Sequence, residues 1–294
     1  MSGERRPAAI LLNRGAATAR SARVREAVEL TRRALDADLL IADTRDAAEL
    51  TGWMAERVAG YRMVVVAGGD GSLSIAYNVL ADRSPDAILG YIPAGFGNAT
   101  RHLLRLPRDP RGLVALIING EPRPVDLVEA DGRLAFFAGA GWDALVAGRY
   151  AETGARRLIG WAAAIARSVP DLVRRQRVTV QADGVVVHEG PMELLIVSTT
   201  PWYGRGLLVN PGARPTAGRI TLRVYSGPFG PFVLDALRWA ARRTPSPPAI
   251  HATEVVARAD DAPLLVQADG DVIGERPEWR FRLRPAAVRI IGRW

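Results

Sequence analysis

A short apolar run that ends abruptly in glycine is the feature that most constrains this chain. Residues 63–67 read Met-Val-Val-Val-Ala, residues 68–72 read Gly-Gly-Asp-Gly-Ser, and the apolar residues that follow recur at helical spacing. This pattern predicts a buried strand, a glycine turn and a helix that begins near Ser72. Backbone N–H groups at such a helix start favour an anion, and glycines let the backbone approach a phosphate closely.

Asp70 would place a carboxylate inside this predicted phosphate site. A carboxylate beside phosphates needs a cation between them, which suggests Mg²⁺. The alternative is a tight strand-to-helix turn in an α/β domain that binds no ligand. We favour phosphate binding, because the whole Gly-Gly-Asp-Gly-Ser sequence follows a valine-rich strand.

The first part of the chain alternates short apolar runs with segments of helical periodicity, and this alternation predicts a parallel sheet. A second glycine turn, Pro-Ala-Gly-Phe-Gly-Asn at residues 93–98, also follows a predicted strand. Both turns should therefore lie at the carboxyl edge of the sheet, where open α/β sheets bind ligands. The predicted strands are 8–12, 39–41, 63–67 and 88–92, and the predicted helices are 22–34, 47–58, 72–80, 99–104 and 111–118.

Beyond residues 120–124 the strands are paired by hairpin signals instead. Ala-Asp-Gly occurs three times between strand-like runs, and Asp-Gly between alternating apolar residues is a strong hairpin signal. The second half is therefore predicted to be mainly antiparallel β with one or two helices, and the last strand could return to the first domain. The hairpin tips are 130–132, 182–184 and 268–270, the helical stretch is 154–173, a proline-rich loop is 244–248, and the last strand is 287–291.

The charge and residue composition of the chain indicate which classes of partner it can bind. The 294 residues carry a formal net charge of +8, and all 39 basic residues are arginine. Arginine binds phosphates through a planar fork, and because these arginines are scattered, a nucleotide or anionic lipid is a better partner than nucleic acid. The chain has no cysteine, which fits a cytoplasmic location, and no run of the ~20 apolar residues that would span a bilayer.

The sequence lacks the motifs of several other classes of nucleotide-binding, metal-binding and hydrolytic proteins. A Walker A motif requires lysine, the glycines at 95 and 97 lack the third glycine of the dinucleotide fingerprint, and the three histidines have no metal-ligand spacing. No serine has the context of a nucleophile elbow. The third Ala-Asp-Gly turn is followed by Asp271, where the first is followed by Arg133 and the second by Val185. Asp271 is therefore either a solvated turn residue or a functional carboxylate.

Taken together, these motifs resemble the diacylglycerol kinase catalytic-domain family, which includes bacterial lipid kinases and sphingosine kinases. The Gly-Gly-Asp-Gly-Ser loop resembles the family's nucleotide loop, and NAD kinases share that loop without the downstream series. The other matching segments follow in order along nearly the whole chain: Asn13, Thr44, 93–98, 125–127, 141–144, 203–206, 211–213 and 268–271.

The resemblance implies a lipid kinase with ATP as phosphoryl donor, Mg²⁺ as cofactor and a lipid hydroxyl as acceptor. It implies a Rossmann-like α/β domain at 1–122, to which 279–294 return, and a mainly antiparallel β-sandwich domain for the lipid at 123–278. We expect a peripheral cytoplasmic enzyme at an anionic membrane surface, and a homodimer is one option for its assembly. The implied catalytic residues are Asp271 and Asp126, the implied metal ligand is Asp70, and the implied nucleotide-binding residues are Asn13, Thr44, Gly68, Gly69, Asp70, Gly71, Ser72, Gly95, Phe96, Gly97 and Asn98.

Some positions depart from the family pattern. Phe96 stands where many members have Thr or Ser, Asp271 is one methylene shorter than the family Glu, and 217–219 replace an Asp-Gly turn that holds a structural Mg²⁺ in some members. Two alternatives therefore stay open: an NAD-kinase-like phosphotransferase, and a weakened homologue that binds lipid or nucleotide without turnover. Further departures are Arg14, Ala17 and Ala99.

Overall fold

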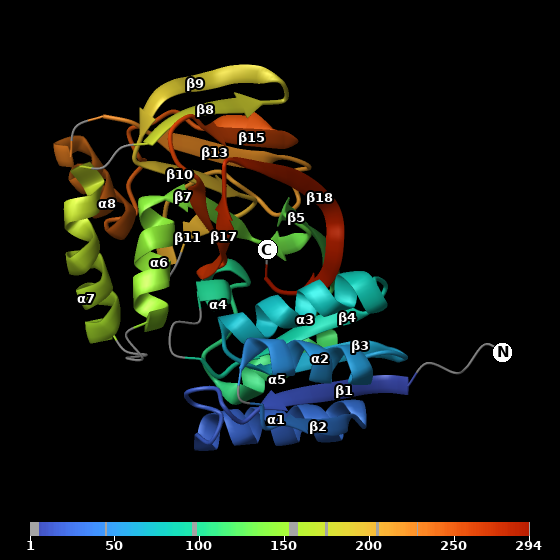
Figure 1. Cartoon of the computed structure of the whole chain (residues 1–294). Coiled ribbons are helices and arrows are strands. Elements are labelled where there is room, and N and C mark those ends of the chain that lie inside the picture. Colours follow the sequence, from blue (N-terminus) through green and yellow to red (C-terminus); the bar gives the residue numbers. More distant parts are fainter. Residues whose placement is uncertain are drawn as a thin grey trace. The chain divides into compact units, whose positions relative to one another are not determined.

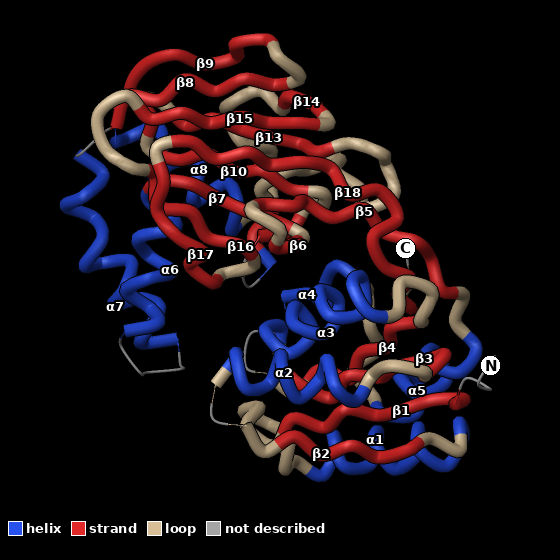
Figure 2. Tube along the Cα trace, turned by 45° about the vertical axis from the view of Figure 1, so that its right-hand side comes forward, coloured by secondary structure: helices blue, strands red, loops and turns tan. Residues whose placement is uncertain are grey.

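The chain forms two compact units. The computed structural model describes residues 6–44, 46–95, 99–152, 158–173, 176–203, 206–227 and 229–293. Unit 1 comprises Met1–Val125 and Ala286–Trp294, and unit 2 comprises Asp126–Pro285. Figures 1 and 2 show the helices and strands of each unit, which we describe separately.

Unit 1 is built on a parallel sheet with the strand order β2-β1-β3-β4. The end of β18 continues the order, since Arg289 and Ile290 pair in parallel with β4. The four residues 64–67 in the middle of β3 are fully buried, as expected of a parallel strand covered on both faces. The strands are β1 (Arg6–Asn13), β2 (Asp38–Ala42), β3 (Tyr61–Gly68), β4 (Ile88–Pro93) and β18 (Glu278–Ile291).

The helices of unit 1 pack in pairs around this sheet. Helix α1 contacts α5, while α2 contacts α3, and members of both pairs contact β4. Helix α3 begins at Asp70, two residues earlier than predicted, because the Leu73 amide already donates to the Gly69 carbonyl. The helices are α1 (Ala22–Leu35), α2 (Ala47–Arg57), α3 (Asp70–Arg83), α4 (Ala99–Leu103) and α5 (Pro110–Asn119).

Unit 2 contains an antiparallel sheet of six strands and a second antiparallel sheet with the order β18-β15-β8-β9. The six-stranded order is β14-β13-β10-β7-β16-β17. The strands of unit 2 not yet bounded are β5 (Pro122–Ala130), which begins in unit 1, β6 (Arg133–Ala135), β7 (Phe137–Gly141), β8 (Gln176–Ala182), β9 (Val185–Met192), β10 (Leu194–Ser198), β11 (Trp202–Tyr203), β12 (Leu207–Leu208), β13 (Ile220–Tyr225), β14 (Ile250–Ala252), β15 (Glu254–Ala259), β16 (Leu264–Ala268) and β17 (Asp271–Arg276).

The central strand β10 shows how unit 2 is layered. Leu195 and Val197 point into a core shared with Val180 of β8 and Phe281 of β18, so the two sheets pack as a sandwich. The alternate side chains of β10 point the other way, into a cluster that includes Trp239 of α8. Because successive side chains face opposite sides of a strand, β10 is buried on both faces. The helices of unit 2 are α6 (Trp142–Glu152), α7 (Leu158–Ser168), the 3₁₀ helix η1 (Val169–Val173) and α8 (Phe229–Ala240).

The predicted fold class is confirmed, and the structure differs from the predicted elements mainly in the second half of the chain. The predicted helical stretch 154–173 corresponds to α7 and η1, whereas α6 and α8 lie outside every predicted helix range. Strand β18 begins at Glu278, nine residues before the predicted start, because residues 278–282 pair with β15. A proline within a predicted strand argues against a continuous strand, and β18 contains Pro285. Pro285 lies between the residues that pair with β15 and those that pair with β4.

Candidate functional site

The glycine turn after β3 brings two glycine segments of unit 1 together. A Cβ on Gly68 would lie 2.5 Å from the Cβ of Ser72, and a Cβ on Gly69 would lie 3.4 Å from the Cα of Gly95. The Ala94 amide donates to the Gly68 carbonyl at 2.7 Å, which joins the ends of β3 and β4. Glycine is therefore required at 68 for space, and at 69 the chain passes in van der Waals contact with the second glycine turn.

The loop after β1 is tied to the same place. The Asn13 side chain donates from Nδ2 to Ser72 Oγ at 2.9 Å, and its Oδ1 accepts from the Gly15 amide at 2.8 Å. The Thr18 amide and hydroxyl both donate to the Ala94 carbonyl, at 2.8 and 3.0 Å. The structure therefore brings Asn13, Ser72 and the start of the second glycine turn together at the carboxyl ends of β1, β3 and β4.

Asp70 is the first residue of α3, and its Oδ1 accepts from the Thr100 amide of α4 at 3.2 Å. The pKa of the Tyr91 phenol is raised, mainly by burial and secondly by the nearby Asp70 carboxylate. The negative charge of Asp70 therefore acts on Tyr91. Gly69 caps α3 without a side-chain hydrogen bond, so the first amides of α3 have no side-chain cap. A carboxylate here beside uncapped amides suits a phosphate with its cation.

A single carboxylate at the glycine turn, that of Asp70, is compatible with Mg²⁺ bound together with phosphates. Among the described residues, no group of three His, Cys, Asp or Glu side chains could hold a metal ion. Mg²⁺ in nucleotide sites is commonly held by one or two carboxylates, with substrate phosphates and water completing its octahedron. Asp70 is the carboxylate that the chain offers at this turn.

For the remaining predicted nucleotide-binding residues we describe only the position in the fold. Thr44 is half-buried and lies two residues beyond the end of β2. Gly71 lies in the first turn of α3. Phe96, Gly97 and Asn98 lie outside the described residues. Their roles, like those of the other site residues, stay predictions.

In unit 2 all three Ala-Asp-Gly segments form tight hairpin turns. Asp131, Asp183 and Asp269 have φ near +50°, and the glycine after each also has positive φ. Two central residues with positive φ are the mark of the type I′ turn, which matches the twist of the flanking strands. The hairpins differ in what the aspartate binds, and these partners lie far away in the sequence.

Asp271 begins β17 directly after the third turn, and its side chain is 57% exposed. Its Oδ2 accepts from Arg133 Nη2 at 2.8 Å, so the residues that follow the first and third turns form an ion pair. A second ion pair joins Asp131 to Arg276 between the same two hairpins. Asp271 is thus an accessible carboxylate on a hairpin that is held at two points.

Asp126, the other predicted catalytic residue, is buried in β5. Its Oδ2 accepts from the Gly218 amide at 2.8 Å, and its own amide donates to the Pro215 carbonyl at 2.6 Å. These contacts join Asp126 to the 215–218 loop, while Asp271 pairs with Arg133.

One group of side chains was missed as a site by sequence reasoning. Asp143 of α6 accepts hydrogen bonds from the Tyr203 hydroxyl and from Gln267 Nε2, the latter at 2.9 Å. Burial raises the pKa of the Asp143 carboxyl to about 6, although hydrogen bonds from Tyr203 and Gln267 act in the opposite direction. Asp143 and Tyr203 both occur in segments that carry the family resemblance, and this resemblance was the one sequence feature that could have indicated a site here.

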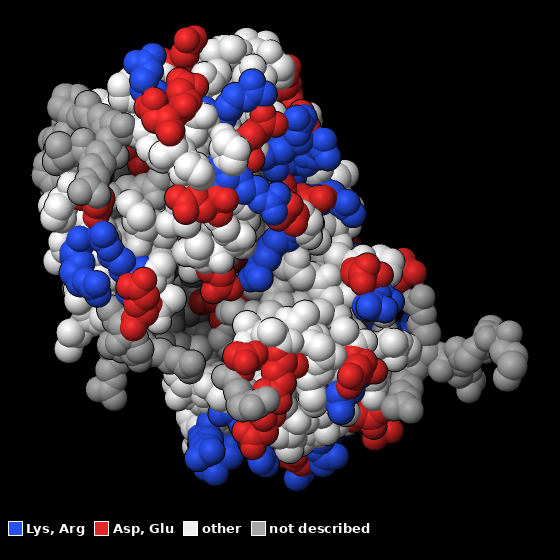
Figure 3. Space-filling model, in the orientation of Figure 1, with Lys and Arg blue, Asp and Glu red and all other residues white. Residues whose placement is uncertain are grey.

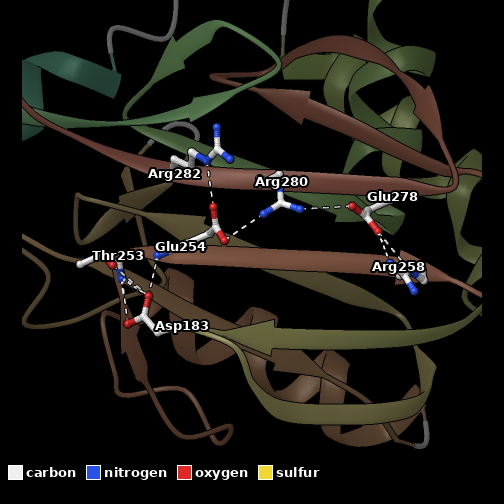
Figure 4. Close-up of polar contacts among 7 residues, drawn as sticks. All are labelled: Asp183, Thr253, Glu254, Arg258, Glu278, Arg280 and Arg282. Atoms are coloured by element: carbon white, nitrogen blue, oxygen red, sulfur yellow. Dashed lines mark hydrogen bonds and ion pairs between the residues drawn. The ribbon is translucent and has the colours of Figure 1, made fainter.

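Most arginines on the outer face of the β8-β15-β18 sheet are neutralised by neighbours. Figure 4 shows Glu254 between Arg280 and Arg282, and Glu278 between Arg258 and Arg280, on adjacent strands. In Figure 3 arginine and acidic side chains likewise alternate over the visible face of unit 2. Exposed pairs of this kind contribute at most about 1 kcal/mol each to stability. The net positive charge is therefore not concentrated on this sheet face.

Comparison with known proteins places the chain in a family. Residues 7–130 match the model of the diacylglycerol kinase catalytic domain, and residues 137–292 match that of the YegS C-terminal NAD kinase beta sandwich-like domain. A probable lipid kinase YegS-like protein of Pseudomonas putida is 25% identical over 263 residues, which cover 84% of this chain and 83% of the relative.

Solved structures show the same fold. A diacylglycerol kinase from Bacillus anthracis superposes with a TM-score of 0.78 at 21% identity, over 98% of this chain and 97% of that one. An NAD kinase from Archaeoglobus fulgidus in complex with ATP has a TM-score of 0.54 at 14% identity, over 97% and 93% of the two chains. With both of its domains matched in order, the chain belongs to the YegS-like lipid kinase family, whose catalytic domain is of the diacylglycerol kinase type.

Proposed function

We propose that this protein transfers the γ-phosphoryl group of ATP to the hydroxyl of a diacylglycerol-like or sphingosine-like lipid in the presence of Mg²⁺. The observation that carries the proposal is the meeting of three strand ends in unit 1, where Gly69 approaches Gly95, Asn13 binds Ser72, and Asp70 begins α3. A cradle of glycine backbone with a carboxylate at its side is suited to a polyphosphate and its cation.

In the proposed reaction the acceptor oxygen attacks the γ-phosphorus, and the bond from that phosphorus to the β,γ-bridging oxygen of ATP breaks. ADP leaves, and the proton of the acceptor hydroxyl passes to a carboxylate, for which we assign Asp271. Mg²⁺, when bound, neutralises phosphate charge. Asn13 and Ser72 hold the loop after β1 against the start of α3, and the backbone at Gly68 and Gly69 positions the phosphates.

The test is an acceptor panel. Purified protein is incubated with ATP labelled in the γ-phosphate, Mg²⁺ and one acceptor from diacylglycerol, sphingosine, other lipids and NAD. We expect label in a lipid and none in NAD. Label in NAD would instead support the NAD-kinase-like alternative. Binding of ATP or lipid without transfer to any acceptor would identify a weakened homologue.

We also propose that the lipid is reached from an anionic membrane surface through α7 and α8. Large apolar side chains stand out on these helices: Ile159 is 79% exposed, Leu234 50% and Leu237 63%. Arg167 on α7 and Arg243 just beyond α8 are exposed as well. Exposed apolar side chains on helices that carry or lead into exposed arginines suit a bilayer with anionic headgroups. Within the described ranges, no helix has the length and apolarity of a membrane span.

Replacing Ile159, Leu234 and Leu237 together by Ser is expected to weaken binding to anionic vesicles by at least about tenfold, since each buried apolar side chain stabilises by about 1.5–3 kcal/mol. Co-sedimentation with vesicles measures the effect, and wild-type binding should fall as salt rises. Val185→Ser is the matched control, because Val185 is 66% exposed on β9. Equal loss in both variants, or equal wild-type binding to neutral and anionic vesicles, contradicts this surface.

A further inference from the structure

Three polar side chains from one helix and two strands of unit 2 form a hydrogen-bonded cluster next to the third hairpin turn, which we call the Asp143 cluster. It comprises Asp143 of α6, Tyr203 of β11 and Gln267 of β16. Gln267 is buried, and its Oε1 accepts from the Gly270 amide at 2.7 Å. Gly270 directly precedes Asp271. We infer that the Asp143 cluster positions the turn that carries Asp271, by fixing which way the Gln267 amide faces.

The orientation of the Gln267 amide follows from the chemistry of its neighbours. An ionised carboxylate only accepts hydrogen bonds, and the Tyr203 hydroxyl donates its single proton to Asp143. The side of Gln267 that faces these two oxygens must therefore be its Nε2, which donates to both. Its Oε1 is then directed at the Gly270 amide. The reversed amide would place Oε1 against two oxygens and its NH₂ group against an N–H.

The surrounding backbone is shaped for this cluster. A Cβ on Gly139 of β7 would lie 1.9 Å from Asp143 Oδ2 and 2.5 Å from the Tyr203 hydroxyl, so only glycine leaves room for the carboxylate. The Ala144 amide donates to Asp143 Oδ1 at 2.8 Å, which holds the other oxygen in place at the start of α6. The carboxylate is thus held from both sides, and Gln267 connects it to the Gly270 turn.

The same turn is held on its other side by Asp269, whose Oδ1 accepts from the Phe136 and Phe137 amides at 3.1 Å. Gly270 has φ of +92°, so the bond from its amide to Gln267 fixes a backbone conformation that directs the next residue. We assign Asp143, Tyr203 and Gln267 as positioning residues for Asp271. The consequence for phosphoryl transfer rests on the proposed function, whereas the effect on the turn does not.

Asp143→Asn tests the inference with almost no change of shape. An Asn side chain that turns its NH₂ group toward Gln267 favours the reversed Gln267 amide, which removes the acceptor of the Gly270 amide. Hydrogen–deuterium exchange at residues 269–271 is expected to become about tenfold faster, as for the loss of one hydrogen bond. The hairpin at 182–184 is the internal control and should keep its exchange rate. With an identified acceptor, kcat should fall while KM for ATP, whose proposed site is in unit 1, stays the same.

The double variant Asp143→Asn with Gln267→Glu supplies a rescue. The carboxylate introduced at position 267 accepts from the Gly270 amide, from the Tyr203 hydroxyl and from the NH₂ group introduced at position 143, so the cluster is rebuilt with its polarity exchanged. Slow exchange at 269–271 and kcat should both return toward wild type. The inference is overturned if the folded single variant exchanges like wild type, or if the double variant exchanges no more slowly than the single one. If the single variant does not fold, the inference requires that the double variant folds and shows wild-type exchange at residues 269–271. A double variant that does not fold, or that exchanges faster than wild type at these residues, overturns the inference.

Exchange needs no substrate, which separates this inference from the proposed function. Altered exchange in Asp143→Asn together with rescue supports the positioning role even if no acceptor in the panel is phosphorylated. In that case the lipid kinase activity fails and the positioning of the turn stands. Normal transfer by an Asp143→Asn protein whose 269–271 turn exchanges fast would remove the link between the turn and catalysis.

Discussion

Asp271→Asn is expected to slow the chemical step of phosphoryl transfer by about 10²–10⁴-fold, because the amide cannot accept the proton of the acceptor hydroxyl. The side chain is more than half exposed, and an Asn oxygen can still accept from Arg133, so the fold should be retained. Single-turnover transfer from ATP to the lipid identified by the acceptor panel measures the effect. Asp271→Glu restores the family residue and is expected to keep activity.

The chain contains two matched controls for Asp271. Asp131→Asn removes the charge of the other ion pair between the same hairpins, that with Arg276, and should leave transfer unchanged. Asp183→Asn alters the second hairpin, where the carboxylate accepts from the Thr253 and Glu254 amides. It should lower the thermal midpoint slightly without an effect on transfer. If Asp271→Asn behaves like these controls, Asp271 is a turn residue only, and the base must be sought first at Asp126.

Asp70→Asn is expected to reduce Mg²⁺-dependent transfer by at least about 10²-fold, because the metal and the phosphates lose the carboxylate that neutralises them. The Asn oxygen can still accept from the Thr100 amide, so the contact between the starts of α3 and α4 is preserved. Calorimetry should show weaker binding of Mg–ATP, and the thermal midpoint should change little.

Asp109→Asn is the control for this change. Asp109 also lies at a helix start in unit 1, where its Oδ1 accepts from the Gly112 amide at 2.6 Å, and Asn caps helices equally well. Transfer should be unaffected in that variant. Undiminished Mg²⁺-dependent turnover in Asp70→Asn would exclude the central role that we assign to this carboxylate.

The elements closest to the site could be predicted because they depend on short-range patterns. The valine run before Gly68 is apolar throughout, as strands buried on both faces are, and the period of 3.6 begins directly afterwards. The three Asp-Gly turns were recognisable for the same reason, since positive φ at two successive residues is a local demand. The motifs around these elements also carried the family resemblance, which the matched domains confirm.

The sequence alone determined the order of strands, glycine turns and hairpins, whereas the tertiary structure decided which side chains meet. Asp271 lies 138 residues from Arg133, and Gln267 lies 124 residues from Asp143, so no local pattern records either contact. Such pairs arise only when sheet register and helix packing bring distant residues together. The same reason explains why α6 and the full length of β18 were missed: their buried faces are defined by the sheets that they pack against or join, and not by their own periodicity.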